Sequence, residues 1–126
     1  MKFLASMLLL PGCLLAAETN EQYWSAWHRE AAEVKKCASP NRVRDFLSDS
    51  LKNLGNAERS EAYAEVLETI IVENPNCFLR AAARLKPTSC KKAIAFYVDG
   101  AIYHEPKELH AALKSAGINI VGCYGS

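Results

Sequence analysis

A histidine and a glutamate near the end of this chain are the first residues whose types could support chemistry. His104 and Glu105 begin like the zinc-protease helix in which two histidines four positions apart bind a metal. The next histidine, His110, comes six residues after His104, and Pro106 stands between them. Rings with this spacing do not share a helical face, so we expect a solvated corner here and no metal site.

No other arrangement of residues indicates catalysis. Ser25 and His28 lie close enough to share a helix, but the sequence supplies no third group that would complete a catalytic triad. The chain also lacks a glycine-rich phosphate loop, a haem-attachment motif and the spacing of a calcium-binding loop. We therefore expect a protein that is not an enzyme and that needs no cofactor.

Cysteines are the remaining reactive residues, and their number is informative. Outside the N-terminal segment the chain holds four, Cys37, Cys77, Cys90 and Cys123, and none of them forms a Cys-x-x-Cys pair. Zinc ligation and thioredoxin-like redox chemistry are therefore weak interpretations. An even number of cysteines in an exported chain predicts two disulfides, for which three connectivities exist.

Residues 1–17 have the composition of a secretory signal peptide. Lys2 gives a positive start, residues 3–10 form a short apolar run, and Ala16 and Ala17 supply small residues for cleavage after Ala17. We therefore expect an exported protein, most simply one of the bacterial periplasm. The alternative is a lipoprotein signal in which Cys13 is lipidated, and only then would the protein attach to a membrane.

The charge balance excludes one class of partner. Removal of residues 1–17 takes away one lysine and no acid, which leaves 14 basic and 14 acidic residues. A chain with no net positive charge lacks the electrostatic footprint of nucleic-acid binding, so we expect no nucleic-acid partner.

Four acids recur at helical spacing, and we interpret them as the solvated outer face of a helix and only secondarily as an acidic docking strip for a basic partner: Glu58, Glu61, Glu65 and Glu68.

Residues 56–85 predict two helices that meet at Asn74 and Pro75, and the rest of the chain is organised around them. Asn74 can cap a helix that has Pro75 in its first position. Two helices precede them: one from Thr19 or Asn20 to Lys36, with Thr19 and Gln22 spaced as a capping box, and one from Pro40 to Leu54, which Gly55 ends in a left-handed turn.

The segment from Ser89 to Tyr103 is ambiguous. Asp99-Gly100 between two apolar runs is typical of a β-hairpin. However, a shift of 31 residues places Pro75 on Pro106 and aligns the apolar positions of the two regions. We therefore favour a fifth helix over residues 89–103, apolar on most sides and hence central, and a sixth over residues 106–116 that Gly117 closes.

These elements predict an all-α protein of about six helices in three stacked antiparallel pairs, forming one domain over residues 18–126. In such a stack the corner loops lie along one edge, so Cys37 and Cys77 would be neighbours. Cys90 and Cys123 would then meet at the opposite edge. We therefore predict the disulfides Cys37–Cys77 and Cys90–Cys123.

The stretch from Asn56 to Leu113, with Asn74-Pro75, Phe78-Leu79 and an alanine-rich helix, resembles the helix-pair units of HEAT-like repeats in small exported bacterial proteins. Some helical periplasmic proteins of this size are immunity proteins against toxins, and the resemblance implies a module that binds another protein, such as a toxin or effector. It implies no site residues.

Two functional hypotheses follow, each with its own candidate residues. For a protein partner, loops on a rigid scaffold are the expected recognition sites, which favours the residues Tyr103, His104, Glu105 and Tyr124. The alternative is a carrier of a small apolar ligand or lipid, whose cavity would be lined by Trp24, Trp27, Phe96 and Tyr97.

Overall fold

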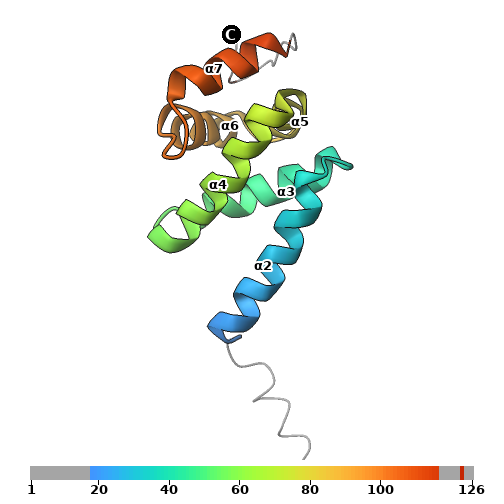
Figure 1. Ribbon diagram of the computed structural model, residues 1–126, viewed down its shortest axis with the longest axis vertical. Helices are drawn as coiled ribbons and strands as arrows, with labels where there is room; N and C mark the ends of the chain where they lie inside the picture. The colour runs from blue at the N-terminus through green and yellow to red at the C-terminus, as the bar shows by residue number, and fades with distance from the viewer. Residues whose placement is uncertain (1–17, 117–122, 124–126) are drawn as a thin grey trace, which may run out of the picture. The chain divides into compact units, whose positions relative to one another are not determined.

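The computed structural model of the protein describes residues 18–116 and Cys123. The predicted signal peptide, Gly117 and Tyr124 lie outside the described residues. In the described part every regular element is helical, which confirms the all-α prediction: α2 (Asn20–Lys35), α3 (Pro40–Leu51), α4 (Ala57–Glu73), α5 (Pro75–Ala82), α6 (Pro87–Ile94), the π-helical turn η1 (Ala95–Asp99) and α7 (Pro106–Ser115) (Figure 1).

The chain divides within α2 into two compact units, with the boundary between Glu30 and Ala31. The first unit contains the start of α2, where the predicted capping box is present. The amide of Gln22 donates to the Thr19 hydroxyl over 3.0 Å, and the Thr19 amide donates to the Gln22 side chain over 2.9 Å. The rings of Trp24 and Trp27 pack edge to face in this unit, with centroids 5.4 Å apart.

Helices in the second unit begin where the sequence places caps and prolines. The Asn74 side chain accepts a hydrogen bond from the Cys77 amide over 3.3 Å, with Pro75 in the first turn of α5. Ser39 caps α3 and Asn56 caps α4 in the same way. A side-chain oxygen at this position satisfies an amide that has no partner within the helix, which is why these starts are readable in the sequence.

The core of the second unit surrounds α5. This helix contacts α3, α4 and α7, and Phe78, Leu79, Ala81 and Ala82 are completely buried. In Figure 1, α4 extends between α3 and the region of α6 and α7, which agrees with its contacts to both α3 and α7. The successive pairs α4–α5 and α6–α7 therefore pack against each other, as the repeated apolar pattern predicts.

Both predicted disulfides are confirmed. Cys37, in the loop before α3, is bonded to Cys77 in the first turn of α5, and Cys90 in α6 is bonded to Cys123. Cys37 has a φ of 54°, the left-handed conformation that commonly follows a helix C-terminus, and its amide donates to the carbonyl of Val34 over 3.0 Å. The end of α2 thus leads directly into the cross-link to α5.

Two helix ends differ from the sequence predictions. The helix that begins at Pro40 ends at Leu51, not Leu54, and Gly55 does not adopt the predicted left-handed conformation. The fifth helix is a helix and not a hairpin, but it ends at Asp99 instead of Tyr103. It is also not enclosed on most sides, because Ala95 is exposed and Phe96 is 49% exposed.

Candidate functional site

A fully buried carboxylate holds the loop that follows η1. Glu68, on α4, has no exposed surface, although its spacing with other acids predicted a solvated position. Its carboxylate accepts a 2.9 Å hydrogen bond from the Ile102 amide and a 3.1 Å bond from the Tyr103 amide. The Nδ1 atom of His104 lies 2.9 Å from the same carboxylate. The prediction that Glu68 belongs to the outer face is therefore wrong.

These contacts explain how an acid can be buried at this position. A buried carboxylate is costly unless hydrogen bonds replace its water, and Glu68 receives them from a segment about 34 residues further along the chain. The Ile102 and Tyr103 amides in turn have no helical partner, because the π-helical turn ends before them. The carboxylate and the loop thus satisfy each other.

The backbone contacts leave two large side chains of the loop in solvent. Ile102 is 56% exposed and Tyr103 is 51% exposed, and Phe96 of η1 is 49% exposed. Among the residues predicted to bind a partner, Tyr103 and Glu105 are therefore at the surface, whereas His104 is partly buried against Glu68. The sequence predicts a role for Phe96 only as a cavity residue of the carrier hypothesis, and it does not single out Ile102 as a partner-binding residue.

Phe96 and Ile102 line a hollow of about 250 Å³ between η1, the loop and α4. Tyr97, Gly100 and Glu61 also line it. Gly100 fits a crowded position, since a Cβ atom there would lie 3.1 Å from the carbonyl oxygens of both Ala95 and Phe96. Its amide donates to the Ala95 carbonyl over 2.9 Å, which closes the π-helical turn at the edge of the hollow.

Two acidic residues of α4 lie beside the exposed apolar residues. Glu61 lines the hollow, and Glu65 is exposed one turn further along α4. The pKa of the Tyr103 phenol is raised, first by partial desolvation and then by the charges of Glu61, Glu65 and Glu68. We call the group Glu61, Glu65, Phe96, Ile102 and Tyr103 the acidic–apolar surface.

Tyr97 forms a buried support behind this surface. It is 2% exposed, and this burial raises the pKa of its phenol. The end of η1 is attached to α7 by a second contact, in which Asp99 lies 2.6 Å from the Nε2 atom of His110. The position of η1 is therefore fixed by its packing against α4 and by its attachment to α7.

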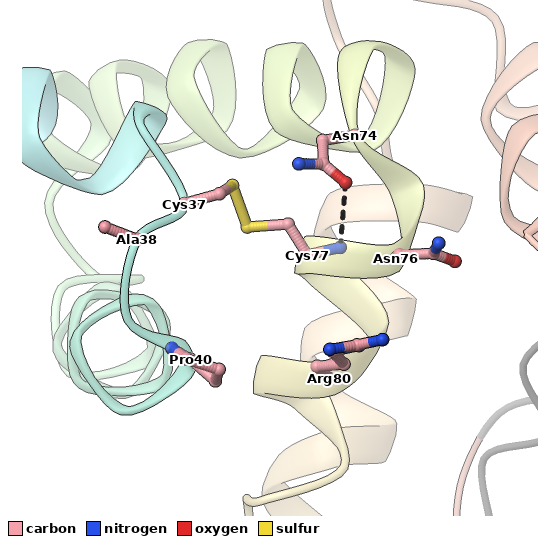
Figure 2. A pocket seen from close by; sticks show the side chains of 7 residues that line it. All are labelled: Cys37, Ala38, Pro40, Asn74, Asn76, Cys77 and Arg80. Carbon is pink, nitrogen blue, oxygen red and sulfur yellow. Dashed lines mark hydrogen bonds between the residues drawn. A yellow bond between two sulfur atoms is a disulfide. The ribbon is translucent and has the colours of Figure 1, made fainter.

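A second hollow, of about 350 Å³, lies at the Cys37–Cys77 disulfide. Figure 2 shows the loop with Ala38 and Pro40 on one side and α5 with Asn76 and Arg80 on the other, joined by the disulfide. One guanidinium and two amides line it, so its chemistry suits an anionic or polar group. Tyr103, His104 and Glu105, the described residues among those predicted to bind a partner, do not line this hollow.

The described residues contain no group of three or more histidine, cysteine or acidic side chains arranged to hold a metal ion. Within residues 18–116, no helix is both long enough and apolar enough to cross a bilayer. Comparison of the chain with known protein families, with curated proteins and with solved structures finds no match.

One signal in the sequence could have identified Glu68. It follows Ala64 by four positions and precedes Ile71 by three, and both of these side chains are buried on α4. A residue with these helical neighbours faces the interior. The regular spacing of the acids concealed this, because Glu68 also lies three positions after the exposed Glu65.

Proposed function

We propose that this chain is an exported, non-enzymatic protein-binding module that acts as an inhibitor or immunity factor by covering a surface of a toxin or enzyme. The observation that carries the proposal is the loop held by Glu68, which leaves Ile102 and Tyr103 exposed beside Phe96. Exposed aromatic and aliphatic side chains on a loop fixed to a rigid scaffold are typical of recognition sites.

The compartment is part of the same proposal. Two disulfides are consistent with an oxidising environment, and residues 1–17 read as a signal peptide, which together favour the bacterial periplasm. N-terminal sequencing of the protein recovered from a periplasmic fraction should begin at Glu18. A chain that keeps Met1 and stays in the cytosol would contradict export, and a chain found only in the membrane fraction would favour lipidation of Cys13.

The binding proposal is tested by placing a photo-crosslinking amino acid at Ile102 and, as a control, at the exposed Asn76 beside the disulfide hollow. Irradiation of producing cells should give a protein adduct from position 102 and not from position 76. The partner, identified by mass spectrometry and then purified, should lose activity when the wild-type chain is added. The variant Ile102→Ser should inhibit it less.

An adduct from neither position, or a purified partner whose activity the chain does not change, would refute the proposal. The structure favours it over a carrier of apolar ligands. The hollow beside Phe96 and Tyr97 is smaller than the roughly 300–1,000 Å³ of typical ligand pockets, and Phe96 is half exposed. Trp24 and Trp27, the other residues of the carrier hypothesis, belong to the first unit.

A further inference from the structure

The two outward carboxylates of the acidic–apolar surface have no partner within the part of the chain that the structure describes. The carboxylates of Glu61 and Glu65 form no ion pair or hydrogen bond with any of the described residues, whereas the carboxylate of Glu68 on the same helix faces inward and is hydrogen-bonded. The hollow that Glu61 shares with Phe96 and Ile102 is lined by no lysine, arginine or histidine. The surface therefore combines uncompensated negative charge with exposed apolar area.

This combination specifies the chemistry of the partner, and the inference rests on the proposed function. We propose that the acidic–apolar surface binds a segment of another protein that carries an arginine or lysine next to an aliphatic residue, with the cation at Glu61 and Glu65 and the aliphatic group against Phe96 and Ile102.

Charge complementarity and size both support a basic protein segment as the occupant. A carboxylate pair repels nucleic acid and anionic lipid headgroups, and it attracts a cationic side chain. The hollow of about 250 Å³ has room for one side chain and not for a helix. The flanking aromatic rings of Phe96 and Tyr103 favour arginine over lysine, because the planar guanidinium stacks on aromatic faces and binds carboxylates through two hydrogen bonds.

The experiment uses the disulfide-bonded chain and an array of seven-residue peptides that share the same aliphatic content and differ in charge from −2 to +2. We expect the wild-type chain to select the cationic peptides, arginine before lysine, and to release them as salt is raised. The double variant Glu61→Gln/Glu65→Gln should weaken their binding by about fivefold or more, the effect of two surface charge contacts. The control Glu58→Gln/Glu73→Gln removes two exposed acids of the same helix and should leave binding within about twofold.

The outcomes separate this inference from the proposed function. If the chain binds peptides of every charge equally, or prefers anionic ones, and Ile102→Ser abolishes that binding, the inference of a basic partner is overturned but the surface still binds protein. The inference of a basic partner is also overturned if cationic peptides bind the Glu61→Gln/Glu65→Gln variant and the wild-type chain with equal affinity, or if no peptide binds at all. Failure of the proposed function is seen elsewhere, as the absence of a crosslinked partner at Ile102.

Discussion

Replacement of Glu68 by glutamine tests the buried contact on which the exposed loop depends. The carboxylate accepts hydrogen bonds from the amides of Ile102 and Tyr103 and lies 2.9 Å from the His104 ring. A glutamine side chain has the same shape but only one acceptor oxygen. In one orientation its NH₂ group faces the Ile102 amide, which then has no acceptor. In the other it faces the Tyr103 amide, whose 3.1 Å bond is lost and which keeps only a longer 3.4 Å contact with the remaining oxygen.

The expected cost follows from burial. A buried donor left without a partner costs about 1–3 kcal/mol, and Glu68 has no exposed surface through which water could compensate. We therefore expect Glu68→Gln to lower the free energy of unfolding by about 1–3 kcal/mol, which corresponds to a fall of several degrees in Tm. Urea unfolding under non-reducing conditions, followed by far-ultraviolet circular dichroism, measures it.

Glu65→Gln is the matched control, because Glu65 lies on the same helix, carries the same group and is exposed. It should change stability by no more than about 0.5 kcal/mol. Hydrogen exchange adds a local measurement, in which the amides of Ile102 and Tyr103 should exchange faster in Glu68→Gln alone. Equal stability of the two variants, together with unchanged protection of both amides, would refute the role assigned to Glu68.

Three further predictions concern the scaffold. Replacing Cys37 and Cys77 together by alanine should lower stability by about 4 kcal/mol, since the bond closes a loop with a sequence separation of 40; a urea midpoint close to that of wild type would contradict this. Asn74→Ala removes the cap of α5 and should cost about 1 kcal/mol in the same assay, whereas no loss would mean that the cap contributes nothing. Because the pKa of Tyr97 is raised, the folded state keeps a proton that the unfolded chain loses above about pH 10. Stability should therefore fall as pH rises through that region, and the fall should be shallower in Tyr97→Phe. Parallel pH profiles of stability for the variant and the wild type would exclude Tyr97 as the source of the fall.

Helix starts and disulfides were predictable because short-range rules determine them. Asn74 with Pro75 marks the first turn of α5 independently of tertiary contacts. The Asn74 side chain caps the helix, and Pro75 has no backbone N–H that would lack a hydrogen-bond acceptor at this position. The disulfides followed from the assumption of stacked helix pairs, because stacking places the corners at Pro40 and Pro75, and with them Cys37 and Cys77, at the same edge. Both inferences need only local spacing and the assumption of stacked helix pairs.

The end of the fifth helix and the role of Glu68 were not predictable in this way. Ala101, Ile102 and Tyr103 continue the apolar pattern of the helix, so local propensity extends the helix through them. In the structure the π-helical turn ends at Asp99, and the amides that follow find their acceptor on α4. This is tertiary structure overriding a local pattern, and the acceptor lies about 34 residues away, beyond the range of any helical periodicity.

The acid at position 68 bears on the proposed function because it orders the loop that carries Ile102 and Tyr103. A buried carboxylate seldom stabilises a fold more than an apolar side chain of similar size would, because its desolvation offsets its hydrogen bonds. What the carboxylate does achieve is directional: it fixes the Ile102 and Tyr103 amides toward α4, so that both side chains are held outward before any partner arrives. A loop ordered during folding loses less conformational entropy on binding, which strengthens association without adding a contact. The contact between Glu68 and the loop therefore connects the helical scaffold to the proposed binding surface.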